Sequence, residues 1–167
     1  GYDVHKSANV VILDDNLDAI NVSTRPATWL QFDTFMMETT NRMMDGPCTL
    51  WGLNHTGRSI KKEAAEYEQD VSLALVFGSM FGFRASANRP TRHGQIKDDV
   101  ERTLVHASQR VRFTSWNAPK KAAGQFKAGG GGISGAYASA EAHQAEGTAA
   151  VLKLVAEFPK LCALDAR

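Results

Sequence analysis

The thirteen residues Val71–Phe83 are almost wholly apolar, and they constrain the fold of this chain more than any other segment. As an α-helix they would extend about 20 Å, well short of the ~30 Å hydrocarbon core of a bilayer. The segment therefore has to be buried, either in a core or against a partner. Because a polar stretch from Ser59 precedes it, we expect one helix from about Ser59 to Phe83, with a polar first half and a buried end.

Three further helices are expected where apolar residues recur at intervals of three or four. The first follows Thr24 and Pro26, which are favourable residues at the start of a helix. It should end at Asp45–Pro47, where a glycine and a proline interrupt the helical pattern. The others are expected from Ile96 to Val111 and from about Ser134 to Phe158.

The N-terminal segment favours β-structure. Val10–Leu13 and Ala19–Val22 read as two short strands around the polar turn DDNLD, which predicts a hairpin. The predicted fold class is therefore mostly α, about four helices with a small N-terminal β-hairpin, and α+β is the fallback. We expect a single domain over residues 1–167, with a basic, partly irregular segment at 84–133 and a glycine-rich joint at 129–132.

The net charge of +1 conceals a strong segregation of charge along the chain. Residues 1–83 hold 6 Lys and Arg against 11 Asp and Glu, and residues 84–128 hold 10 against 3, a local net charge of +7. Residues 129–167 hold 3 against 4. Such segregation creates a local field even in a nearly neutral protein, so the central segment is the candidate contact for a polyanion.

Aromatic residues are interleaved with the cations of this basic segment. In RVRFTSWNAPKKAAGQFK, Phe113, Trp116 and Phe126 alternate with basic side chains, and exposed aromatic rings can stack on unpaired bases. The candidate polyanion-binding residues are Arg84, Arg89, Arg92, Arg102, His106, Arg110, Arg112, Trp116, Lys120, Lys121 and Lys127. The structural alternative is that Phe113 and Trp116 belong to the core and that the cations solubilise the surface or meet an acidic partner. No signature of a known nucleic-acid-binding module accompanies the segment.

The run KAGGGGISG matches the dinucleotide fingerprint G-x-G-x-x-G at Gly130, Gly132 and Gly135. The fingerprint requires a buried strand before the glycines and a βαβ unit around them, and neither pattern is present. The run is not a Walker phosphate-binding loop either, because no Gly-Lys-Ser/Thr sequence follows the glycines. The run is interpreted as a joint, and no cofactor is expected.

Catalytic and metal-binding motifs are also missing. The five histidines are dispersed, and none forms an H-E-x-x-H or His/Cys motif, so neither a catalytic nor a metal site is predicted. The chain is expected not to be an enzyme. The rival hypothesis is a small enzyme whose site is assembled from scattered residues such as His93, Asp99 and His106.

The two cysteines, Cys48 and Cys162, are far apart in sequence, and free thiols are typical of a reducing intracellular compartment. The chain begins with Gly1 rather than Met, which processing for an organelle or a virion, or the removal of a tag, would explain. No membrane span is predicted, and a peripheral membrane contact stays open.

These observations together predict a non-catalytic structural subunit of a larger, oligomeric assembly. Its basic segment would contact RNA or another polyanion, as in a coat protein or nucleoprotein, a ribonucleoprotein subunit or a subunit of an organellar complex. Its partners would be other protein subunits. The alternative is an accessory subunit that binds proteins alone and makes no nucleic-acid contact.

Overall fold

The computed structural model describes residues 9–14, 17–54, 69–70, 75–85, 96–107, 109–119 and 137–164. The chain divides into two compact units. The first comprises Gly1–Arg89 and His106–Lys121, and the second comprises Pro90–Val105 and Ala122–Arg167. The expectation of a single domain stays a prediction, and the glycine-rich joint lies outside the described residues.

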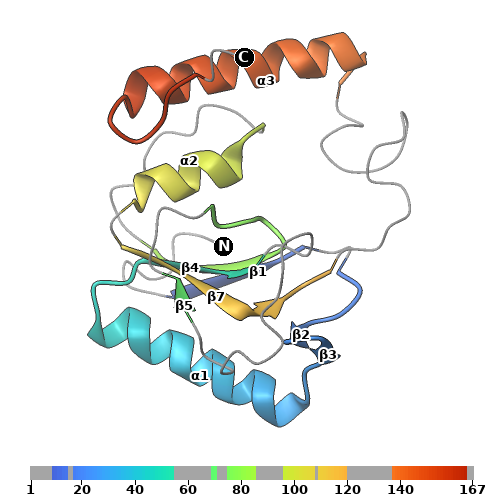
Figure 1. The fold of residues 1–167 in the computed structure, drawn as a ribbon, viewed down its shortest axis with the longest axis vertical. Coiled ribbons are helices and arrows are strands. Elements are labelled where there is room, and N and C mark those ends of the chain that lie inside the picture. The colour runs from blue at the N-terminus through green and yellow to red at the C-terminus, as the bar shows by residue number, and fades with distance from the viewer. Residues whose placement is uncertain are drawn as a thin grey trace. The chain divides into compact units, whose positions relative to one another are not determined.

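A seven-stranded mixed sheet is the centre of the first unit (Figure 1). The strands are β1 (Asn9–Leu13), β2 (Asn21–Val22), β3 (Arg25–Pro26), β4 (Leu50–Asn54), β5 (Gln69–Asp70), β6 (Met80–Arg84) and β7 (Arg110–Asn117). They lie in the order β1-β6-β4-β7-β2-β3, and β5 also pairs with β7. Within this sheet β4 and β7 pair in parallel, from Leu50 opposite Arg110 to Leu53 opposite Phe113, whereas the other pairs are antiparallel.

Helix α1 (Trp29–Asp45) begins with a complete capping box. The Gln31 amide donates to the Thr28 hydroxyl (3.3 Å), and the Gln31 side chain accepts from the Thr28 amide (2.9 Å), which satisfies two donors that the first turn leaves without partners. The predicted end at Asp45 is confirmed, and the Gly46 amide closes the helix on the Arg42 carbonyl (3.1 Å). The predicted start was too early, because Pro26 belongs to β3.

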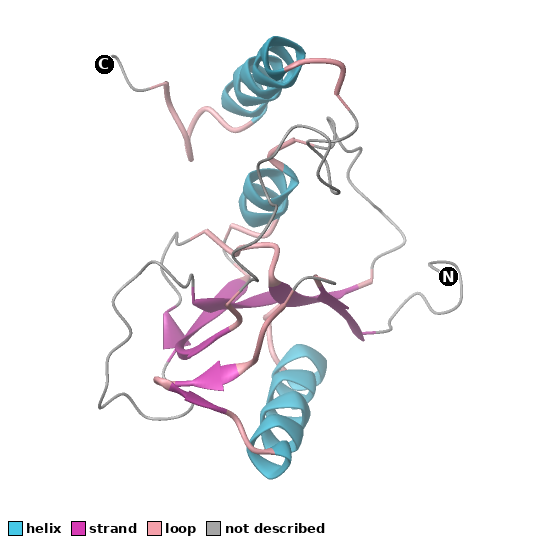
Figure 2. Cartoon of the chain, turned by 90° about the vertical axis from the view of Figure 1, so that its right-hand side faces the viewer, coloured by secondary structure: helices cyan, strands magenta, loops and turns pink. Residues whose placement is uncertain are grey.

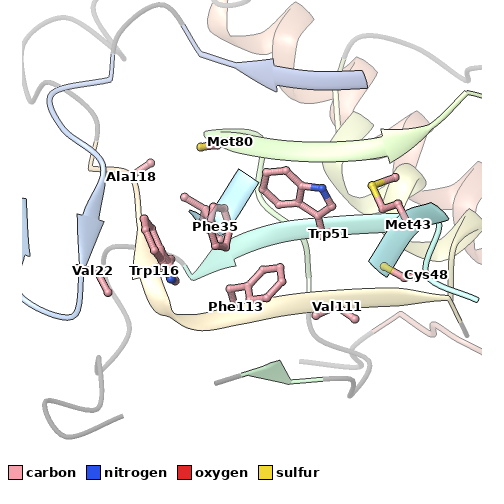
Figure 3. Close-up of a cluster of buried hydrophobic side chains, with 11 residues drawn as sticks. Val22, Phe35, Met43, Cys48, Trp51, Met80, Val111, Phe113, Trp116 and Ala118 are labelled. Atoms are coloured by element: carbon pink, nitrogen blue, oxygen red, sulfur yellow. The ribbon is translucent and has the colours of Figure 1, made fainter. Parts of the chain in front are cut away.

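The main core forms where α1 lies along one face of the sheet (Figures 1 and 2). Phe35 of α1 stacks on Trp116 with 4.3 Å between ring centroids, and its ring meets Phe113 (4.9 Å) and Trp51 (5.4 Å) edge to face. Figure 3 shows these side chains converging from α1, β4 and β7. Such aromatic pairs contribute about 0.5–1.5 kcal/mol beyond the burial of their area, so Phe35 is central to the helix–sheet contact.

Two strand glycines leave room for the side chains of neighbouring residues. A Cβ on Gly82 of β6 would lie 2.3 Å from Trp51 Nε1, so the indole ring occupies the space that any other residue's side chain would need. A Cβ on Gly52 of β4 would lie 2.4 Å from a methyl group of Val76. Val76 is fully buried in a smaller cluster with Leu50 and Phe81.

The second unit contains helices α2 (Asp98–Val105) and α3 (Ala140–Glu157). The Ser139 hydroxyl caps α3 by accepting from the Ala142 amide (3.2 Å). Within this unit, a Cβ on Gly147 of α3 would be in ordinary van der Waals contact with Ile96, at 3.6 Å. Among the residues that the structure describes, no helix combines the length and the apolar character that a membrane span requires.

The prediction of a mostly α fold with four helices was wrong. The described residues contain three helices and seven strands, so the fold is α+β, which was the fallback. The N-terminal hairpin was also wrong. The segment at its first predicted strand forms β1, which pairs with β6, whereas β2 pairs with β3 and β7. β1 and β2 pair with other strands and not with each other, and the residues of the turn between them cannot indicate those pairings.

The two central helices of the prediction also needed correction. Residues 80–83, expected at the buried end of a helix, belong to β6, and most of the remainder of that predicted helix lies outside the described residues. The predicted helix at Ile96–Val111 ends at Val105, and Val111 belongs to β7. The C-terminal helix was correct in type, with its observed start at Ala140 and its end at Glu157.

Candidate functional site

Three of the predicted polyanion-binding residues meet at one end of the sheet. Here the end of β6 lies beside the start of β4, since the Arg84 amide donates to the Thr49 carbonyl (3.0 Å). The Thr49 amide in turn donates to the Gln109 carbonyl (2.8 Å), just before β7. Arg84, His106 and Arg110 thereby come together although 26 residues of sequence separate the first from the last.

His106 is positioned by Thr49. The Thr49 hydroxyl lies 2.7 Å from His106 Nδ1 and 3.2 Å from Gln109 Oε1. It donates to Gln109 Oε1 and can accept from Nδ1 of His106 when that nitrogen carries a proton. A hydroxyl hydrogen-bonded to an imidazole is the smallest set of groups that could act as a nucleophile and its general base. In this protein the same contacts tie together the starts of β4 and β7, which is sufficient to account for them.

Two arginines flank the buried Cys48 at this end of the unit. Arg84 donates to the Gly46 carbonyl (3.5 Å), and Arg42 forms an ion pair with Glu38 (2.8 Å). Burial raises the pKa of the Cys48 thiol, and the hydrogen bond to Leu50 and the positive charges of Arg42 and Arg84 oppose this only in part. Cys48 is therefore a protonated thiol near neutral pH, not a reactive thiolate. The sequence prediction did not include Arg42, which a last-turn position on a predicted helix could have indicated.

The arginines of β7 do not form an exposed basic surface. Val111 and Phe113 belong to the core cluster beside α1, and because side chains alternate along a strand, Arg110 and Arg112 point to the opposite face. Both are buried, and Arg110 Nη1 donates to the Ala107 carbonyl.

The aromatic residues of the basic segment are core residues where the structure describes them. Trp116 has no exposed surface, and Phe113 is equally enclosed. Neither ring can stack on a base without leaving its contacts with Phe35. The structural alternative raised by the sequence therefore accounts for these two residues.

The remaining candidates are in other places. Arg102 belongs to α2 in the second unit and lies 3.6 Å from Asp98. Asp99, named in the enzyme hypothesis, accepts from the Val100 amide (2.9 Å) in the first turn of the same helix. The other candidates lie outside the described residues, and these are Arg89, Arg92, His93, Lys120, Lys121 and Lys127. In the described ranges, no three His, Cys, Asp or Glu side chains are grouped closely enough to hold a metal ion.

A different surface is unusual, namely the outward face of α1. Trp29, Leu30, Met37 and Met44 are 86%, 76%, 61% and 68% exposed. Leu30, Met37 and Met44 are spaced by seven residues, so they follow one face of the helix with a drift of only about 20° per step. We call these four residues the apolar row.

The apolar row borders the core at its N-terminal end. Trp29 meets Phe32 edge to face, with 6.4 Å between the ring centroids, and Phe32 packs against the core cluster. The exposed polar residues on the same face are Asp33, Thr34, Asn41 and Asp45. The sequence contained a signal for three members of this row, because Leu30, Met37 and Met44 recur every seven residues.

Comparison of the chain with protein-family models, with curated proteins and with solved structures finds no match in any of the three.

Proposed function

We propose that the protein is a non-catalytic subunit of a larger assembly, and that it docks on a protein partner through the apolar row of α1. The observation that carries this proposal is the row itself, four large exposed apolar side chains of one helix, of which Leu30, Met37 and Met44 share its outward face. Single exposed apolar residues are normal, but a grouping of them on one surface is typical of an interaction site.

The size of the effect supports docking on another apolar surface. Burying a fully exposed Leu, Met or larger side chain stabilises a complex by about 1.5–3 kcal/mol, so the four residues of the row supply at most roughly 6–12 kcal/mol. Association costs about 4–15 kcal/mol in lost freedom of movement. A polar partner would leave little net affinity, whereas a partner that contributes apolar surface of its own gives a stable complex.

The geometry favours a protein partner over RNA. Contact with RNA needs accessible cations and aromatic faces. Of the predicted polyanion-binding residues that the structure describes, Arg110, Arg112 and Trp116 are buried, and the rest are half-buried. The polar residues on the α1 face carry negative charge at Asp33 and Asp45, which repels a phosphate backbone.

Sedimentation of native extracts tests the proposal. We expect the wild-type chain in particles heavier than its own 18.2 kDa, and we expect Met37→Lys to release it. Leu152→Lys is the matched control, because Leu152 is an exposed leucine on α3 and should leave the particle intact. A wild-type chain that sediments alone would overturn the proposal. Particles that ribonuclease disperses and Met37→Lys leaves intact would also overturn it, in favour of RNA contact.

A further inference from the structure

We propose that the occupant of the apolar row is the same row of a second copy of this chain, packed antiparallel about a two-fold axis at Met37. This inference rests on the proposed function, because it names the partner of that same surface. Three properties of α1 carry it: the spacing of the row, the pairing of its polar residues, and the apolar area that two copies bring together.

The spacing of the row is symmetric about its centre. Leu30 and Met44 each lie seven residues from Met37, on either side. A two-fold axis perpendicular to the helix at Met37 therefore places each Leu30 opposite the partner's Met44, and Met37 opposite its own equivalent. An interface of this kind is isologous, the commonest type in homodimers. The small drift of the row around the helix suits a crossing angle of about 20°, as in coiled-coil packing.

The polar residues of the face are complementary in the antiparallel arrangement. Asp33 lies at the level of the partner's Asn41, whose amide can donate to the carboxylate. A parallel pair in register would instead place Asp33 against Asp33. Like charges in direct opposition are unfavourable, so the face itself selects the antiparallel pair.

The area is sufficient for a weak, specific dimer. An aromatic side chain contributes about 150–250 Å² and an aliphatic one about 60–120 Å², so the exposed parts of two rows bring together roughly 600–1,000 Å² of apolar surface. With the flanking polar residues, this reaches the lower end of specific interfaces, at about 1,000–1,200 Å². A partner without an apolar row would bury half as much apolar surface. We therefore expect self-association in the micromolar range.

Disulfide trapping tests the pairing and its register. In a Cys162→Ser background, the purified Met37→Cys chain should form a disulfide-linked dimer on mild oxidation with diamide, because the two thiols meet at the axis. Leu30→Cys alone should not, since the two copies of residue 30 are about 21 Å apart along the helices, whereas a disulfide needs Cα atoms within roughly 7 Å. An equimolar mixture of Leu30→Cys and Met44→Cys chains should cross-link. The remaining cysteine, Cys48, is buried and is present in every sample, so any cross-linking through it is the same for all variants.

Two results would overturn the inference. One is cross-linking of Leu30→Cys and Met44→Cys each with itself, which indicates a parallel pair. The other is a wild-type chain that sediments as a monomer up to about 100 μM with no Met37→Cys dimer. If in that second case Met37→Lys still releases the chain from its native particle, self-pairing fails while the proposed function stands. If Met37→Lys releases nothing, both fail.

Discussion

Replacing Trp116 with alanine distinguishes the two roles that the sequence allowed for this residue. As a base-stacking residue, Trp116 would contribute to RNA binding and little to stability. As the core residue found in the structure, it has no exposed surface and stacks on Phe35 at 4.3 Å. Removing a buried Trp or Phe side chain costs about 3–5 kcal/mol, which is a large part of the ~5–15 kcal/mol that stabilises a typical domain.

Tryptophan fluorescence during urea unfolding measures this loss selectively. The three tryptophans, Trp29, Trp51 and Trp116, all belong to the first unit, so their emission reports the unfolding of that unit. In the Trp116→Ala variant, Trp51 remains as a buried reporter beside Phe35. We expect the free energy of unfolding to fall by about 3–5 kcal/mol.

Trp29→Ala is the matched control, because the same side chain is removed from an exposed position. Its effect on the free energy of unfolding should stay within about 0.5 kcal/mol. A loss below about 1 kcal/mol for Trp116→Ala would refute the core role of this residue. A salt-sensitive loss of oligonucleotide binding in that variant, at unchanged stability, would establish the stacking role instead.

Four further predictions concern single residues. Gly82→Ala should lower the free energy of unfolding by about 1–3 kcal/mol in urea titrations, because the new Cβ would overlap Trp51. Gly147→Ala should raise the melting temperature, because its site has room for a Cβ and alanine favours a helix. The free energy of unfolding should fall above about pH 8.5, the ordinary pKa of a thiol, because burial raises the pKa of Cys48 in the folded state and unfolding then releases a proton. Urea midpoints measured between about pH 7 and 10 should fall less steeply in the Cys48→Ser variant. Met37→Lys and Met37→Glu chains should each sediment as monomers and associate when mixed, and failure of the mixture to associate would contradict the two-fold axis at Met37.

The helices could be predicted from local sequence in part, because their signals are local. The end of α1 follows from the interrupted pattern at Asp45–Pro47, and the long C-terminal helix follows from its alanine-rich composition. The start of α1 could not be placed correctly. Thr24 and Thr28 are both suitable caps, and only the pairing of Arg25–Pro26 with β2 excludes the first.

The sheet could not be predicted, because its pairings join distant segments. β4 and β7 pair in parallel between residues 60 positions apart, such as Leu50 and Arg110, and no local turn indicates such a pairing. The apolar run to Phe83 is ambiguous in itself, since a helix and a central strand that are buried on all sides have the same composition. Val111 completed a helical stripe by coincidence, although the alternation of Arg110, Val111, Arg112 and Phe113 is that of a strand.

The alternation of side chains along β7 also explains why the basic segment at 84–128 does not form an exposed basic surface there. A net charge of +7 over residues 84–128 describes the sequence, but a partner meets only the charges that the fold exposes. In β7, the strand period sends Phe113 into the core and Arg112 to the other face, and that arginine is buried as well. On α1, by contrast, the helical period leaves Leu30, Met37 and Met44 outside once Phe35 has fixed the inner face. The candidate interaction site is therefore the apolar row and not the most charged segment, because exposure is a property that only the fold assigns.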